Sequence, residues 1–150
     1  MIKGWRSIES TLFLSISFTL ALIAFRFIYF RQLQFTFYVW NLFLAAIPLL
    51  LSRQITRLKK LNMRALFLLI WWLLFLPNAP YIITDIFHFY ERPGVPKWYD
   101  LLLITSAAWN GLITGIVSLL QVEEFLTKCL SSLKVNLVMA AAILSCAFGI

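Results

Sequence analysis

Five long apolar runs with few charges constrain this chain more than any other feature. A helix rises about 1.5 Å per residue, so about 20 apolar residues cross the roughly 30 Å hydrocarbon core of a bilayer. Hydrocarbon offers the backbone no water, so a run that crosses it must be helical. The predicted spans are residues 8–27, 35–51, 65–83, 101–121 and 135–150.

The composition also indicates that lipid hydrocarbon surrounds most of the chain. Hydrophobic residues make up 62% of the 150 residues and charged residues 13%, about half the charged share of a soluble domain. The sequence therefore predicts an all-α, polytopic transmembrane helix bundle that forms one integral membrane domain over residues 1–150. The last run reaches Ile150 without a polar flank and rises only about 24 Å, so we expect a C-terminally truncated chain or a helix that stops inside the bilayer.

The distribution of Lys and Arg predicts the orientation, because cytoplasmic connections are rich in these residues. Nine of the 13 Lys and Arg residues lie at the N-terminus or in the connections near residues 52–64 and 121–134. The remaining four, on the opposite side, are Arg26, Arg31, Arg92 and Lys97. We therefore expect a multi-pass protein of the bacterial plasma (inner) membrane with its N-terminus in the cytoplasm.

The basic connection has two interpretations. Arg53, Arg57, Lys60 and Arg64 recur at helical spacing, so they could form an amphipathic helix that binds anionic lipid, each basic residue contributing about 1 kcal/mol near the surface. An ordinary positive-inside loop explains the same residues. The net charge of +7 does not indicate nucleic-acid binding, because no nucleic-acid motif surrounds the basic residues.

The third run is interrupted by LPNAP, residues 76–80. A helix that stopped at Leu76 would rise only about 18 Å, whereas one that continues to Ile83 rises about 28 Å. The sequence therefore predicts one span that is kinked at 77–80 inside the membrane. Pro77 and Pro80 lack N–H donors, and Asn78 is placed to cap the next turn.

Three asparagines fall at comparable depth in three different spans. Asn41, Asn78 and Asn110 lie on the second, third and fourth runs. Asn41 is about 9 Å from the start of the second run, and Asn110 is about 14 Å from the start of the fourth. One hypothesis is that the three side chains converge around the broken helix as a ligand-binding or polar cluster. The alternative is that each one bonds locally to its own backbone or to a nearby hydroxyl.

The fourth run carries small residues one turn apart. Ala107, Gly111 and Gly115 form a small-xxx-small stripe, which permits close approach of another helix. The stripe predicts helix packing, either within this chain or against a membrane-protein partner.

Polar side chains follow the break in PYIITDIFHFYERPGVPKWYD. On an α-helix, Thr84, Asp85, His88, Glu91 and Arg92 would share an arc of roughly 120°. Asp85 and His88 are the candidate catalytic residues, as an acid/base pair in which the carboxylate orients the imidazole. Asp85, His88, Glu91 and Asp100 are also weak candidate metal ligands, short of a defined zinc motif. A solvated polar face at the outer interface is the alternative.

The same stretch resembles a known family. LFLPNAPYIITDIFHF followed by WYDLLLITSAAWNGLITG is similar to the uncharacterised bacterial multi-pass membrane proteins grouped as domain of unknown function 1361, over about residues 40–150. The resemblance implies a polytopic membrane fold and no established activity or cofactor. The residues that match the signature are Pro77, Asn78, Ala79, Pro80, Tyr81, Thr84, Asp85, His88, Trp98, Tyr99, Asp100, Trp109 and Gly111.

Three functions remain open from the sequence. The first is a non-enzymatic membrane protein with a structural, accessory or small-ligand-binding role. The second is a membrane-embedded enzyme whose outward-facing Asp85 and His88 act with or without a metal. The third is a channel or carrier with a cavity at the broken helix, although no Asp, Glu, Lys or His lies in the middle of a span. Cys129 and Cys146 form no CxxC pair and are expected to be free thiols.

Overall fold

A computed structural model describes residues 3–31, 33, 35–89 and 94–148, and the regular structure in these ranges is entirely helical. This confirms the predicted all-α class. The elements in chain order are α1 Lys3–Phe30, α2 Phe37–Thr56, α3 Met63–Phe75, α4 Asn78–Tyr81, the 3-10 helix η1 Ile82–His88, α5 Lys97–Thr127 and α6 Ser132–Phe148.

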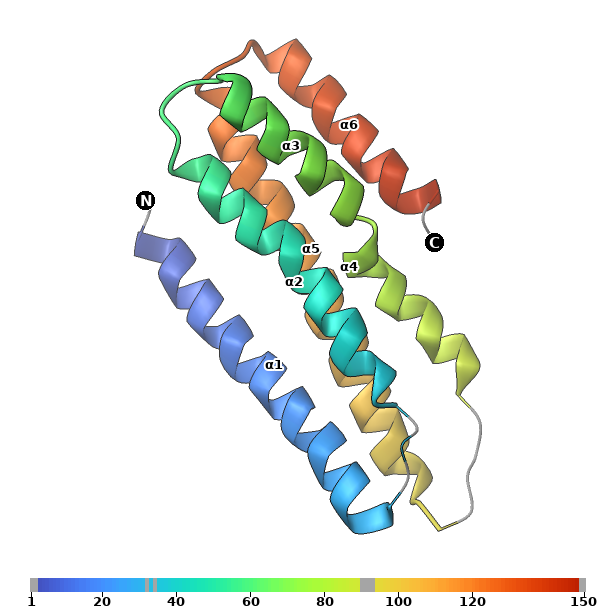
Figure 1. The fold of residues 1–150 in the computed structure, drawn as a ribbon. Helices are drawn as coiled ribbons and strands as arrows, with labels where there is room; N and C mark the ends of the chain where they lie inside the picture. Colours follow the sequence, from blue (N-terminus) through green and yellow to red (C-terminus); the bar gives the residue numbers. More distant parts are fainter. Residues whose placement is uncertain (1–2, 32, 34, 90–93, 149–150) are drawn as a thin grey trace.

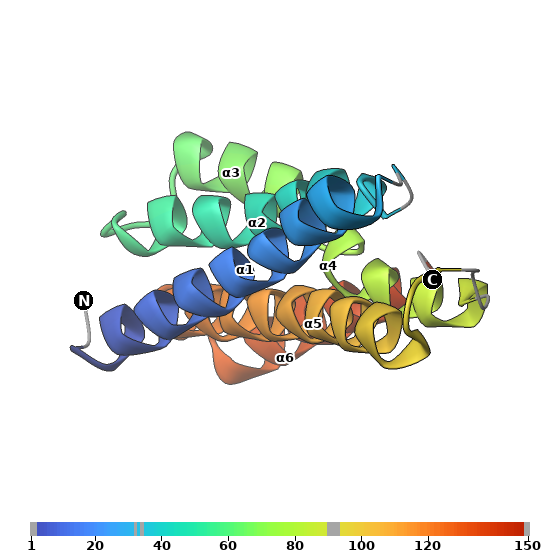
Figure 2. The same ribbon diagram turned by 90° about the horizontal axis from the view of Figure 1, so that it is seen from below.

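The bundle is organised around α5, the longest helix at 31 residues. It contacts α1, α2, α4, η1 and α6. Figures 1 and 2 show α2 beside α5, α1 along one side of this pair, and the succession α3, α4 and η1 along the other. The start of α1, the α2–α3 connection and the α5–α6 connection lie at the same end of the bundle; we call this the basic end.

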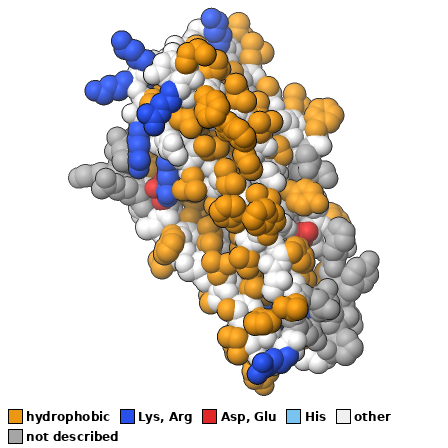
Figure 3. Space-filling model, viewed as in Figure 1, with side chains coloured by type: hydrophobic (Ala, Val, Ile, Leu, Met, Phe, Trp, Pro, Cys, Tyr) orange, Lys and Arg blue, Asp and Glu red, His pale blue; other side chains and the backbone are white. Residues whose placement is uncertain are grey.

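The helices suit a multi-pass membrane protein. In the described ranges, four helical segments are long and apolar enough to cross a membrane: Ser7–Phe30, Phe37–Thr56, Met63–Phe87 and Lys97–Thr127. The fifth apolar helix, α6, is shorter at 17 residues. Large apolar side chains face outward, as with Phe13 at 70% and Leu14 at 68% exposure, and they cover the face in Figure 3. Such a surface is stable in lipid and not in water.

Buried polar side chains lie inside this apolar shell. They are Thr19, Arg26, Ser52, Asp100, Asn110, Thr114, Ser118 and Gln121. On α5 they recur about once per turn along the buried face from Asn110 to Gln121. Polar groups inside and apolar groups outside are the arrangement expected where lipid surrounds the helices, because hydrogen bonds between helices then help to hold the bundle together.

The basic connection is not one continuous helix. Helix α2 ends at Thr56 and α3 begins at Met63, so Arg57 and Lys60 lie between the helices. The amphipathic-helix interpretation was therefore wrong for this segment. The side chain of Asn62 accepts a hydrogen bond from the backbone N–H of Ala65 at 2.9 Å, which satisfies one free donor of the first turn of α3.

The segment after the break is a 3-10 helix and not the predicted α-helix. η1 covers Ile82–His88, and Phe89 is extended. With three residues per turn, positions three apart are eclipsed, so the predicted α-helical arc does not form. Glu91 and Arg92 lie outside the described residues.

Candidate functional site

Local hydrogen bonds replace part of the helical pattern at the break between α3 and α4. The backbone N–H of Ala79 donates to the carbonyl of Leu76 at 3.1 Å, which leaves the carbonyl of Phe75 without its usual partner four residues on. The Asn78 amide donates to this Phe75 carbonyl at 3.0 Å. Asn78 therefore satisfies the end of α3, and the prediction that it caps the following turn was wrong.

The broken helix rests against the small residues of α5. A Cβ atom at Gly111 would lie 2.6 Å from the backbone oxygen of Ala79 and 2.9 Å from Cδ1 of Ile82. A Cβ atom at Gly115 would lie 3.0 Å from Cβ of Ala79. The stripe, with the buried Ala107, is thus in contact with the chain's own α4 and η1. Cavity space at the break is apolar: a pocket of about 140 Å³ is lined by Leu76, Pro80, Leu112, Gly115, Ile116, Leu119, Ile143 and Cys146.

The second asparagine joins α2 to η1. The Asn41 amide donates to Oδ2 of Asp85 at 3.0 Å. This bond brings one predicted cluster residue together with the predicted catalytic carboxylate. The side chain of His88 lies outside the described residues, so the predicted Asp85–His88 pair stays a prediction.

The third asparagine joins α5 to α1. The Asn110 amide donates to Oγ1 of Thr19 at 2.8 Å and to the carbonyl of Ser15 at 3.2 Å. Asn41, Asn78 and Asn110 thus bond to three different sets of partners, and the structure does not bring these amides into one hydrogen-bonded cluster.

Asp100 is held in a buried ion pair. Oδ1 accepts from Nε of Arg26 at 2.7 Å and Oδ2 from Nη2 at 3.1 Å, and the two residues are 2% and 1% exposed. Both oxygens are therefore engaged with a guanidinium, which disfavours Asp100 as a metal ligand. No group of three or more His, Cys, Asp or Glu side chains that could hold a metal occurs in the part of the chain that the structure describes.

A second polar network joins three helices at the basic end. Oε1 of Glu9 on α1 accepts from Nε of Arg53 on α2 and from Nε2 of Gln121 on α5, each at 2.8 Å. Oε1 of Gln121 in turn accepts from the Ser52 hydroxyl at 2.8 Å. One carboxylate thus links α1, α2 and α5.

Glu124 forms a separate set of hydrogen bonds at the same end. Its Oε2 accepts from the Trp5 indole N–H at 2.9 Å, and its Oε1 accepts from Nζ of Lys128 at 2.7 Å. Trp5 belongs to α1, so both acidic residues attach the start of α1 to the rest of the bundle.

The network borders a pocket of about 270 Å³, which we call the end pocket. It is lined by Trp5, Glu9, Arg53, Thr56, Leu58, Lys59, Gln121, Glu124, Phe125, Lys128 and Cys129. Three of these side chains are cationic and two are anionic. Of the pockets at the break and at the basic end, this one offers both charge and hydrogen-bond donors to a ligand.

The spacing of polar residues in the sequence could have indicated the end pocket. Trp5 and Glu9 are four residues apart, and Gln121 and Glu124 are three apart, so each pair shares a helix face. Polar residues at the ends of two apolar runs on the same side of a membrane are candidates for a common site. The positive-inside pattern accounts for the basic residues here and predicts no role for their acidic partners.

Comparison with known proteins gives a family and no activity. The family described as "Protein of unknown function (DUF1361)" matches residues 40–150, as the resemblance predicted. No curated protein and no solved structure matches the chain.

Proposed function

Because the chain belongs to the DUF1361 family of proteins of unknown function, we propose an activity from its own geometry: it is a non-enzymatic multi-pass membrane protein that binds a small ligand in the end pocket. The observation that carries the proposal is the end pocket itself, a cavity of about 270 Å³ bordered by charged side chains from α1, α2 and α5. Ligand sites of drug size measure about 300–1,000 Å³, so this one suits a small polar group.

The state of the carboxylates supports binding over catalysis. Glu9 and Glu124 each accept two hydrogen bonds from side chains of the bundle. Both carboxylates are thus committed to partners within the bundle, which suits a role in holding the helices around a pocket. A catalytic carboxylate would instead need an oxygen within reach of the proton it transfers.

The proposed setting is the bacterial inner membrane, with the N-terminus and the end pocket on the cytoplasmic side. The gathering of Lys and Arg at the basic end supports it (Figure 3). Arg57, Lys60 and Arg64 are exposed there, and with Arg53 they are the proposed contacts for anionic lipid.

A thiol in the end pocket gives a direct test. Cys129 lines the end pocket and is partly exposed, and Cys146→Ser leaves it as the only cysteine. We expect a bound ligand to slow alkylation of Cys129 by N-ethylmaleimide, by about tenfold at ten times its Kd. The protein would be held in maltoside micelles and offered inorganic phosphate, short-chain phosphatidylglycerol, glycine betaine or glucose.

The matched control places a thiol just outside the end pocket. Ser131 is exposed and two residues from Cys129, so the chain with Cys129→Ser, Cys146→Ser and Ser131→Cys reports general effects of each compound. Protection of Cys129 alone supports the proposal. Equal protection of both thiols, or protection by none of the four compounds, contradicts it.

A further inference from the structure

We infer that the end pocket is a phosphate site, which accepts either the phosphate of a lipid headgroup or a free phosphate. The inference rests on the proposed function and names the chemistry of its ligand. It follows from the donors that the polar network leaves unused, from the charge balance of the pocket wall and from its place in the bundle.

The guanidinium of Arg53 supplies the first donors. Only its Nε is bonded, to Glu9, and in the described chain the Nη groups have no protein partner. Arg has five N–H donors in a planar fork that matches phosphate oxygens. The bond to Glu9 holds the side chain in place while the rest of the fork remains able to bind an anion.

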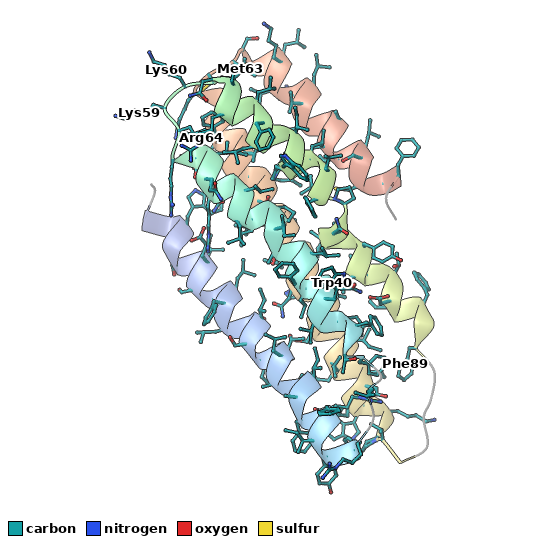
Figure 4. All side chains as sticks on the ribbon, viewed as in Figure 1. Trp40, Lys59, Lys60, Met63, Arg64 and Phe89 are labelled. Carbon is teal, nitrogen blue, oxygen red and sulfur yellow. The ribbon has the colours of Figure 1, made fainter. Side chains whose placement is uncertain are left out.

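Two lysines add positive charge around the same cavity. Lys59 lies on the α2–α3 connection beside Lys60 (Figure 4), and it lines the end pocket, whereas Lys60 does not. No partner in the described chain neutralises Lys59. Lys128 donates one of its three ammonium N–H groups to Glu124.

The charges of the wall leave a surplus of one positive charge among the described residues. Arg53, Lys59 and Lys128 carry three positive charges and Glu9 and Glu124 carry two negative charges. A phosphodiester carries one negative charge and would balance the surplus. A neutral or a cationic ligand would leave this positive charge unbalanced.

The place of the cavity agrees with a phosphate ligand. The end pocket lies between the termini of apolar spans and next to the exposed basic connection 57–62. This is where a helix leaves the hydrocarbon and meets the headgroups. An anionic headgroup from the bilayer and a phosphate from solution can both reach it.

The test measures Cys129 alkylation in the Cys146→Ser chain, with Lys59→Gln as the variant and Lys134→Gln as the control. Lys134 is exposed near the start of α6 at the same end and does not line the end pocket. Lys59 holds no other side chain in the described structure, so its loss leaves the fold intact. We expect inorganic phosphate or phosphatidylglycerol to protect Cys129 in the parent chain. Lys59→Gln should raise the half-protecting concentration about threefold to tenfold, and Lys134→Gln should leave it unchanged.

The outcomes separate the inference from the proposed function. Protection by glycine betaine or glucose without protection by either phosphate compound overturns the phosphate site and keeps the ligand pocket. Protection by none of the compounds overturns both. Equal effects of Lys59→Gln and Lys134→Gln indicate a diffuse surface charge and overturn the site.

The source of the phosphate is decided by the same assay in two media. If inorganic phosphate protects Cys129 in maltoside micelles, which contain no phosphate, the site takes a soluble ligand. If it does not, and nanodiscs of phosphatidylglycerol protect more than nanodiscs of phosphatidylcholine, the site takes an anionic headgroup. Either result supports the phosphate site.

Discussion

Arg26 and Asp100 form the most deeply buried ion pair among the described residues. The guanidinium also lies 4.6 Å from the ring centre of Phe35, a geometry in which a cation is attracted to the ring face. Phe35 has a φ of 72°, which a bulky side chain seldom adopts. The pair thus joins α1 to the first turn of α5 and fixes the turn that leads into α2.

Removing one member of this pair should lower the free energy of unfolding more than removing both. We expect Arg26→Met to lower the free energy of unfolding by about 3–5 kcal/mol, because it leaves a buried carboxylate without a counter-charge. The double substitution Arg26→Met with Asp100→Leu should lose much less. Detergent-based chemical unfolding of each variant measures the difference.

Arg31 provides the control for that experiment. It lies five residues further on and is exposed, so Arg31→Met should change stability by less than about 0.5 kcal/mol. A loss for Arg26→Met no greater than that for Arg31→Met would show that the ion pair is dispensable.

The sequence placed Arg26 at the end of the first run and Asp100 directly before the fourth, and it could not join them. Spacing along one helix predicts which residues share a face, but it does not predict which face of a different helix lies opposite. The same limit applies to Asn41 with Asp85 and to Asn110 with Thr19. Each is a contact between helices that are distant in sequence, so the pairing depends on the packing of the whole bundle.

The broken helix is a packing element that fits α5. Asn78 satisfies the freed carbonyl of Phe75, and Gly111 allows the backbone at Ala79 to approach closely. A break inside hydrocarbon must have its carbonyls bonded within the protein. The LPNAP segment and the glycine stripe of α5 therefore pack directly against each other.

Two alanine substitutions on α5 should separate steric conflict from helix propensity. Gly111→Ala would place a methyl group against a backbone oxygen, and we expect a loss of about 1–3 kcal/mol from overpacking. In Gly115→Ala the new methyl group would contact only the Cβ of Ala79, at 3.0 Å. The gain in helix propensity of about 1 kcal/mol should offset the cost of this close contact.

The measurement is thermal unfolding of the two variants in the same micelles. Gly111→Ala should melt below the parent and Gly115→Ala close to it. A neutral Gly111→Ala would mean that α4 and α5 are further apart than this contact requires.

Apolar runs predicted the helical class because hydrocarbon leaves the backbone few alternatives. The position of the kink followed from Pro77 and Pro80 and the length of the third run. The 3-10 form of Ile82–His88 did not follow, since periods of 3.0 and 3.6 residues are hard to distinguish over seven residues. Helix α5 extends beyond the predicted 101–121 to Lys97–Thr127, because the polar turns that flank an apolar run can also be helical.

The whole molecule has two polar ends and an apolar girdle. The Arg26–Asp100 pair joins helices toward one end, and the Glu9–Arg53–Gln121 network joins them at the other. Among the described residues, the basic end combines such a network with a pocket that carries spare cationic donors. The proposed phosphate site therefore requires this end to lie in the cytoplasmic headgroup region of a membrane.

Thiol labelling in intact bacterial cells tests this most directly. In a chain with Cys129→Ser and Cys146→Ser, Lys59→Cys reports the basic end and Lys97→Cys reports the start of α5 at the opposite end. We expect a membrane-impermeant maleimide to label Lys97→Cys in intact cells and Lys59→Cys only after the inner membrane is permeabilised. Labelling of Lys59→Cys in intact cells, with Lys97→Cys protected, would contradict the account.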